Sequence, residues 1–142
     1  MMEIVQIPFV KHLGILQQDD RLWLPPDTVL QNHIGTFHAG VIYTLAETAS
    51  GMALTRDFPK LAGNVTALLR SSEIRYKSPA KTALYATTQI DKTEAETFLH
   101  RLETRRRASI NVYVTVKGEE NDITVMEGVF GWFVALDADG GS

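Results

Sequence analysis

The chain has 142 residues, enough for one hydrophobic core, and we expect a single domain over residues 1–142. Hydrophobic residues make up 44% and charged residues 22% of the sequence, which is typical of folded globular proteins and not of disordered ones. The formal net charge of -3 argues against nucleic acid as a partner, and the absence of cysteine excludes disulfides, thiol nucleophiles and cysteine-based metal centres.

The beginning of the chain, residues 1–11, lacks the basic start and apolar run of a secretion signal. No segment approaches the roughly 20 consecutive apolar residues that span a bilayer. We therefore expect a cytoplasmic protein with no membrane association.

The first half of the chain predicts two short strands followed by a long helix. The strands are expected over residues 15–24 and 28–31, and two consecutive prolines between them end the first strand. Over residues 38–55, apolar side chains recur at three- and four-residue steps, which is typical of a helix. The other positions of this helix are mostly alanine, glycine, serine and threonine, so it can be buried on several sides. No other long helix is predicted.

The second half of the chain predicts strands, with apolar and polar side chains alternating most clearly from Ile110 to Val116. The four predicted strands cover residues 69–77, 83–90, 108–117 and 123–136. The segments outside them are turns at 78–81, 92–107 and 117–122, and a flexible tail at 137–142. Consecutive strands with short connections predict an antiparallel meander. The whole order predicts an α+β fold in which a curved antiparallel sheet wraps around one long central helix.

Glu47 is the only charged residue of the central stretch between His38 and Thr55. A carboxylate on a buried helix is costly unless it has a partner or a function. One interpretation places Glu47 at a helix edge that reaches water or a cation, and the other makes it a functional acid. The residues before the helix favour the second interpretation.

The segment before the helix, Asn32 to Gly40, holds an amide, two imidazoles and two glycines. A helix start exposes unpaired N–H groups at the positive end of the helix dipole, which favours an oxyanion there. Glu47 follows Gly40 by seven residues, so the two share one helix face but lie roughly 10 Å apart along the axis. A two-fold related helix running the other way would bring Gly40 of one protomer towards Glu47 of the other. The spacing therefore predicts a homo-oligomer with two equivalent composite sites per dimer.

The positions of Asn32, Gly35, His38 and Gly40 reproduce the N-x-x-G-x-x-H-x-G turn of hotdog-fold thioesterases of the phenylacetate-pathway type. In that family an acid follows the motif histidine by nine residues, which is where Glu47 stands. The segment from Tyr76 to Lys81 is also similar to a strand end and turn of the family. The resemblance covers most of the chain after residue 31 and implies a hotdog fold.

The resemblance also implies a function, hydrolysis of an acyl-CoA thioester at a dimer-interface site. By similarity, Gly40 would donate its N–H to the thioester oxygen, Glu47 would act as nucleophile or general base, and Asn32 would place water or substrate. The remaining turn residues would bind the substrate: His33, Gly35, His38 and Ala39. The resemblance implies a dimer or a dimer of dimers, with coenzyme A as part of the substrate and no separate cofactor.

The chain departs from the family pattern at three positions. Ala39 replaces the usual first glycine of the turn, and Glu47 stands where close relatives more often carry aspartate. Leu69 occupies the place of a supporting hydroxyl on the next strand, with three hydroxyl residues nearby, Thr66, Ser71 and Ser72. The added methylene of Glu47 moves its carboxylate by over an ångström relative to aspartate, which affects a positioned attack.

Two other functions remain as alternatives. His33 precedes Glu47 by fourteen residues, the spacing of the histidine and glutamate in hotdog acyl-carrier-protein dehydratases, so hydration or dehydration of an acyl thioester is one of them. A non-catalytic acyl-CoA binding module is the other, favoured by Ala39 and by the missing hydroxyl. His33 and His38 lack a third ligand nearby, so no metal site is predicted.

Overall fold

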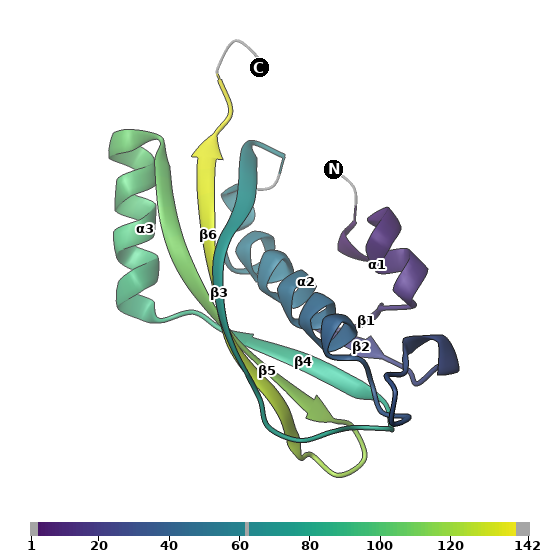
Figure 1. Ribbon diagram of the computed structural model, residues 1–142. Helices are drawn as coiled ribbons and strands as arrows, with labels where there is room; N and C mark the ends of the chain where they lie inside the picture. Colours follow the sequence, from purple (N-terminus) through teal and green to yellow (C-terminus); the bar gives the residue numbers. More distant parts are fainter. Residues whose placement is uncertain (1–2, 62, 139–142) are drawn as a thin grey trace.

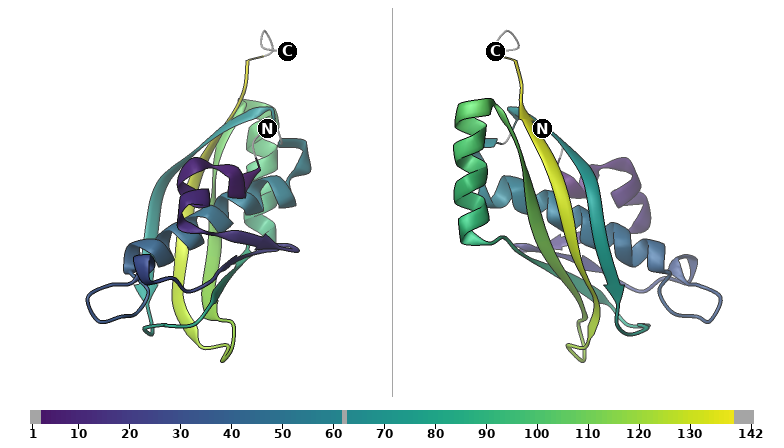
Figure 2. Two further views of the ribbon diagram at one scale, coloured as in Figure 1. Left: turned by 90° about the vertical axis from the view of Figure 1, so that its right-hand side faces the viewer. Right: turned by 60° about the vertical axis from the view of Figure 1, so that its left-hand side comes forward.

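A computed structural model describes residues 3–61 and 63–138. The six strands are β1 (Leu16–Gln18), β2 (Arg21–Leu24), β3 (Val65–Tyr76), β4 (Leu84–Gln89), β5 (Arg107–Gly118) and β6 (Thr124–Leu136). They form one antiparallel sheet in the order β1-β2-β4-β5-β6-β3, which curves around the central helix α2 (Ala39–Asp57) (Figures 1 and 2). The predicted α+β fold with a sheet wrapped around one long helix is confirmed.

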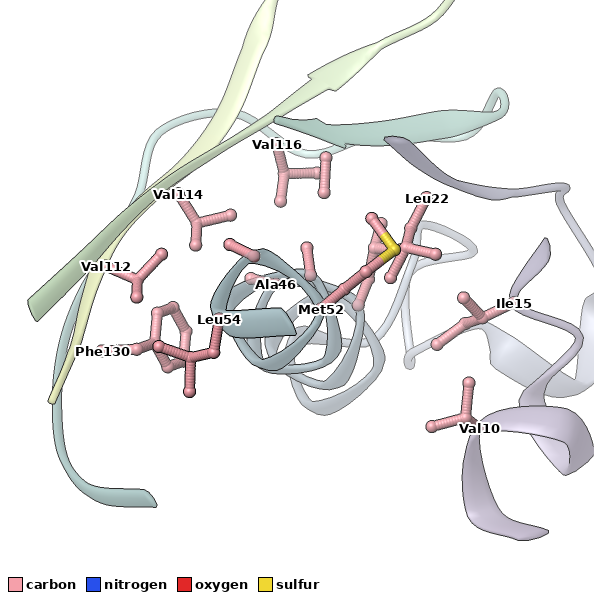
Figure 3. Close-up of a cluster of buried hydrophobic side chains, with 14 of the residues drawn as sticks. Val10, Ile15, Leu22, Ala46, Met52, Leu54, Val112, Val114, Val116 and Phe130 are labelled. Atoms are coloured by element: carbon pink, nitrogen blue, oxygen red, sulfur yellow. The ribbon is translucent and has the colours of Figure 1, made fainter. Parts of the chain in front are cut away.

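Helix α2 is buried because its small side chains let the surrounding elements approach closely. Ala46 is fully buried, and Val112 and Val114 of β5 face the helix from one side (Figure 3). Leu22 of β2 and Ile15 lie on its other side (Figure 3). The wrapped helix lies at the centre of the described core. Each large apolar side chain buried there stabilises the fold by roughly 1.5–3 kcal/mol.

The charged stretch 92–107, expected as a turn, forms a second long helix, α3 (Lys92–Arg105). The prediction of a turn was wrong, because only a narrow apolar stripe marks this helix among many charges. Phe98 and Leu102, one turn apart, are buried, and the Phe98 ring packs against Phe58 with 5.1 Å between ring centroids. The Asp91 side chain accepts a hydrogen bond from the backbone N–H of Glu94 and caps the helix start.

The N-terminal elements also differ from the predicted ones. The strand expected over residues 15–24 is a hairpin of β1 and β2, which turns at Asp19 with a φ of 55°. The strand expected over residues 28–31 is instead a short 3-10 helix, because the Asp27 side chain accepts from the N–H of Val29 and favours a helical turn. The other helical segments are η1 (Ile4–Gln6), α1 (Pro8–Leu13) and η3 (Pro59–Leu61). None of the helices in the described residues is long and apolar enough to cross a membrane.

Strand β3 does not pair with β4, the next strand in sequence, as the predicted meander required. The meander holds for β4, β5 and β6, whereas β3 pairs with β6 and forms the outer edge of the sheet. Its register places Ser72 opposite Phe130, so this serine faces α2, while Ser71 lies opposite Gly131 on the other face. Within the described residues β3 has no neighbour on its second side, and its 12 residues present an open strand edge.

Asp137, the first residue of the predicted tail, is tied to the sheet. Its N–H donates to the carbonyl oxygen of Asn64 at 2.9 Å, and its carboxylate accepts from the hydroxyl of Thr66 at 3.1 Å. Its carbonyl oxygen accepts from the Arg106 guanidinium at 3.0 Å. Residues 139–142 of the predicted tail lie outside the described residues.

Candidate active site

Asn32 organises the turn that leads into α2. Its Oδ1 accepts from the backbone N–H groups of Ile34 and Thr36, both at 3.0 Å. Its Nδ2 donates to the Thr36 hydroxyl at 2.8 Å and to the Phe37 carbonyl at 3.4 Å. A side-chain amide has two acceptor and two donor positions, so all of its capacity is used within the turn. In this conformation Asn32 shapes the backbone and has no bond left for a water molecule or a substrate.

The turn is fixed at its centre and at its end. Gly35 adopts a φ of 77°, a left-handed conformation that glycine reaches without strain. The N–H of Phe37 donates to the Ala80 carbonyl at 2.8 Å, and the N–H of His38 donates to the Leu30 carbonyl at 2.9 Å. These bonds hold the turn between the segment that precedes it and the segment that follows β3, and so set the position at which α2 begins.

His38 caps the first turn of α2. Its Nδ1 accepts the backbone N–H of Gly40 at 2.8 Å, which requires a neutral imidazole with the proton on Nε2. The N–H group predicted to bind an oxyanion is therefore already bonded in this chain. The N–H of Ala39 has no acceptor among residues 3–61 and 63–138, and His38 and Ala39 are both exposed. The Gly40 N–H becomes free for another acceptor only when the His38 side chain turns away.

Glu47 lies partly buried on α2, two turns after Gly40. Burial raises the pKa of its carboxyl group above the ordinary value for glutamate. In the part of the chain that the structure describes, the carboxylate has neither a hydrogen bond nor an ion pair. The described residues thus supply no cation to Glu47, and the interpretation as an ion-paired edge residue loses that support.

The helix positions one turn before and one turn after Glu47 are joined to the sheet. The Tyr43 hydroxyl lies 2.9 Å from the Ser72 hydroxyl of β3. Trp132 of β6 covers Gly51, where an added Cβ would lie 3.3 Å from the indole ring, and its Nε1 donates to the Ser50 hydroxyl at 2.8 Å. These contacts hold the Glu47 segment at a fixed distance from β3 and β6.

The three hydroxyls considered near Leu69 have different positions. Ser72 faces α2 and bonds to Tyr43, which lies on the same helix face as Glu47. Ser71 lies on the opposite face of the sheet, and Thr66 is bonded to the tail. Of these three, only Ser72 therefore faces the helix that carries Glu47.

The sequence did not indicate that Tyr76 belongs to the site. Its hydroxyl donates to the carbonyl oxygen of Ala39 at the start of α2, at a distance of 3.0 Å. Burial, and to a smaller extent the nearby Tyr43, raise the pKa of Tyr76. The available signal was the segment from Tyr76 to Lys81, which resembles the family without indicating which of its side chains reaches the turn.

A pocket of about 270 Å³ lies between the turn and the segment that follows β3. The residues along it include Asn32, Phe37, Ala39, Tyr76 and Lys77. Pockets that hold whole ligands usually measure roughly 300–1,000 Å³, so this one accommodates only part of a large substrate. Glu47 does not line it. One chain therefore keeps the helix start and the acid in separate places.

Two further hollows on the described surface contain none of the predicted site residues. A larger hollow of about 620 Å³ lies on the face of the sheet opposite α2, along β3, β5 and β6. It contains none of the residues predicted to act in catalysis, and its size alone is a poor guide to the chemistry. His33 is exposed in the turn, and no hydrogen bond or ion pair of the described residues joins it to Glu47. No group of three or more histidine, aspartate or glutamate side chains within the described ranges is arranged to hold a metal ion.

Comparison with known proteins gives a family and a fold. The sequence profile of the family described as "Domain of unknown function (DUF4442)" matches residues 16–134. No curated protein matches the sequence.

Three similar solved structures come from bacteria. PA5026 from Pseudomonas aeruginosa, described as a protein of unknown function and probable thioesterase, is 21% identical over 94% of this chain and 91% of that chain, with a TM-score of 0.80. BH2602 from Bacillus halodurans, described with CoA, is 24% identical over 89% of this chain and 74% of that one, with a TM-score of 0.67. OLEI01261 from Chlorobaculum tepidum, of unknown function, is 15% identical over 93% and 88%, with a TM-score of 0.77. At these identities the likeness establishes the shared fold, a hotdog fold.

Proposed function

Because the chain belongs to the DUF4442 family and has a hotdog fold, we propose that it hydrolyses an acyl-CoA thioester at a site shared by two protomers. The observation that carries the proposal is Glu47, a partly buried carboxylate without a partner among the described residues and with a raised pKa. A carboxylate whose pKa is raised above its ordinary value is a stronger base when it is ionised. The description of the Bacillus halodurans protein with CoA supports coenzyme A as the carrier of the acyl group.

In the proposed reaction, the Glu47 carboxylate takes a proton from a water molecule, and the resulting hydroxide attacks the thioester carbon. The negative charge that develops on the carbonyl oxygen is stabilised by the N–H of Gly40 from the other protomer at the positive end of α2. The carbon–sulfur bond then breaks, and the CoA thiolate takes the proton back from Glu47. Direct attack by Glu47 on the thioester is the other route, and water would then hydrolyse the resulting mixed anhydride.

Three features of the single chain support a site built from two protomers. Gly40 and Glu47 are two helical turns apart, roughly 10 Å along the axis, so one thioester carbonyl does not reach both within one chain. The pocket at the helix start likewise excludes Glu47. The open edge of β3 offers unpaired backbone groups to a second copy. A two-fold axis beside β3 would give two identical sites.

The turn residues have supporting roles in this proposal. Asn32 and Gly35 hold the backbone in shape, since the Asn32 amide is fully bonded and Gly35 provides the left-handed conformation. The N–H of Ala39 is a second donor for the substrate oxygen. His33 and His38 are exposed beside the pocket and would contact the substrate from the rim.

A non-catalytic acyl-CoA binding module is a second candidate. The bond between His38 Nδ1 and the Gly40 N–H favours it, because the donor required for catalysis is occupied in the chain. Such a module would bind acyl-CoA without releasing the thiol. The same assay therefore distinguishes the two functions.

The decisive assay measures CoA release from short, long and aromatic acyl-CoAs by wild type, Glu47→Gln and the matched control Glu120→Gln. Glu120 is exposed in the turn between β5 and β6, away from α2. Wild type and Glu120→Gln should hydrolyse the same substrates, and Glu47→Gln should be about a thousandfold slower. Equal rates for Glu47→Gln and wild type would remove Glu47 from the mechanism. Tight binding of acyl-CoA with no release by wild type would support the binding module, and enoyl-CoA hydration that depends on His33 would support a hydratase.

A further inference from the structure

We infer that Tyr76 is a positioning residue that orients the peptide group between Ala39 and Gly40, and with it the N–H that acts on the substrate; this inference rests on the proposed hydrolysis. The Tyr76 hydroxyl donates to the carbonyl oxygen of Ala39 at 3.0 Å. That carbonyl and the N–H of Gly40 belong to one planar peptide group and point in opposite directions. A bond that fixes the carbonyl therefore also fixes the direction of the N–H.

The Tyr76 bond adds to the ordinary helical bonding of this carbonyl. A carbonyl in the first turn of a helix accepts from the residue four positions later and keeps a second lone pair. Tyr76 uses this second position from β3, across 37 residues of sequence. A hydrogen bond to the carbonyl polarises the peptide group and strengthens its N–H as a donor by roughly 10–30%. Tyr76 thus orients the Gly40 N–H and makes it a better partner for an oxyanion.

His38 holds the same peptide group at its N–H end. The His38 bond and the Tyr76 bond behave differently during the proposed reaction. His38 Nδ1 occupies the Gly40 N–H at 2.8 Å, so this bond must break when the substrate oxygen binds. The Tyr76 bond is made to the carbonyl and can persist throughout the reaction. It therefore keeps the N–H aimed in one direction while its acceptor changes from an imidazole to the thioester oxygen. This matters at Gly40 because glycine restricts the backbone less than any other residue.

Tyr76 is well placed to act in this way. It is the last residue of β3 and lies opposite the buried Met126, and the N–H of the following Lys77 donates to the Val125 carbonyl at 2.8 Å. The end of β3 is therefore fixed against β6. Burial raises the pKa of Tyr76, so its phenol remains protonated and continues to donate at the pH at which Glu47 is ionised.

The kinetic test compares Tyr76→Phe with the matched control Tyr113→Phe. Both remove one hydroxyl, but Tyr113 lies on the opposite face of the sheet, where its hydroxyl bonds to Glu94. For Tyr76→Phe, kcat should fall about tenfold while KM changes by less than about twofold, since the hydroxyl acts on the transition state more than on substrate binding. Tyr113→Phe should match wild type. If wild type hydrolyses acyl-CoA and Tyr76→Phe has the same kcat, the inference is overturned and the proposed function stands.

A second readout does not require turnover. Acetonyl-CoA, a ketone analogue that cannot be hydrolysed, is titrated into ¹⁵N-labelled protein while the Gly40 amide resonance is followed. The resonance should shift when the ketone oxygen accepts the N–H, and the shift should be smaller by at least roughly 10–30% in Tyr76→Phe. Equal Gly40 shifts in wild type and Tyr76→Phe would overturn the inference. If wild type releases no CoA from any substrate, the proposed function fails on its own, and the titration still decides whether Tyr76 orients this N–H.

Discussion

The turn before α2 and the middle of α2 differ in how far their polar side chains are hydrogen-bonded within the chain. In the turn, Asn32 makes four hydrogen bonds and His38 caps the helix start. In the middle of the helix, burial raises the pKa of Glu47, and no residue of the described chain bonds to its carboxylate. Polar groups that are satisfied within the chain hold its shape, whereas a partly buried carboxylate without a protein partner costs stability and is a candidate for a function. The comparison separates the residues that build the turn from the one that we propose reacts.

The largest expected effect is on kcat, when the turn is disabled in one protomer and the middle of α2 in the other. Gly40→Pro removes the N–H from the first helical turn, where proline is tolerated, and Glu47→Gln removes the proposed base. Each variant alone should lose at least about a hundredfold in kcat. Mixed dimers contain one intact site if each site takes Gly40 from one protomer and Glu47 from the other.

Refolding the two variants together in equal amounts should therefore restore about a quarter of the wild-type rate, because about half of the dimers are mixed and each has one intact site. Circular dichroism checks that both parents fold. No recovery on mixing would place both residues in the same protomer and contradict the composite site.

Replacing Asn32 should cost stability. Asn32→Ala removes four hydrogen bonds, and at roughly 0.5–1.5 kcal/mol each the free energy of unfolding should fall by about 3 kcal/mol. Asn32→Asp keeps the two acceptor bonds and should lose about half as much. Urea unfolding measures both. A loss below about 0.5 kcal/mol for Asn32→Ala would mean that the turn does not depend on this amide.

The His38 cap should contribute less. His38→Ala removes one acceptor at the helix start, and the loss of a cap lowers the free energy of unfolding by about 1 kcal/mol. His100→Ala, at an exposed position of α3, is the control and should change stability by less than about 0.5 kcal/mol. The variant also frees the Gly40 N–H from its bond to the imidazole. This N–H therefore stays available as a donor to the substrate, and hydrolysis should not slow. A large fall in kcat would give His38 a direct role in the reaction.

The smallest expected effect is the pH dependence of stability at Glu47. The folded protein binds the Glu47 proton more tightly than the unfolded chain, because burial raises the pKa of the folded carboxyl. Below the ordinary glutamate pKa both states are protonated and nothing is lost. As the pH rises through the raised pKa, the folded state loses stability relative to the unfolded one.

Glu47→Gln should therefore melt at a higher temperature than wild type at about pH 8, and the difference should disappear at about pH 4. Thermal unfolding at both pH values measures it, with Glu120→Gln as the control. In the same window, hydrolysis by wild type should fall as acid protonates the base. A difference in melting temperature that is the same at both pH values would assign it to packing and not to ionisation.

The fold was predictable where one local pattern dominates. The apolar repeat of α2 and the alternation of β5 identify these elements in the sequence. Helix α3 was not predictable in this way, because its buried residues are few among many charges and its stability comes from packing against Phe58 and β5. The place of β3 beside β6 was also beyond the local pattern, because strand order depends on where the whole sheet closes around α2.

For the site, the sequence by itself determined the spacing of Asn32, Gly40 and Glu47, because helix geometry converts the seven residues between Gly40 and Glu47 into a fixed rise along the axis. Only the tertiary structure decided what each group bonds to. In it the Asn32 amide bonds within the turn, and His38 accepts the Gly40 N–H. Tyr76 donates to the Ala39 carbonyl from 37 residues away. Spacing within a helix is a local property of the backbone, whereas contacts between distant residues follow from the packing of the whole sheet around α2.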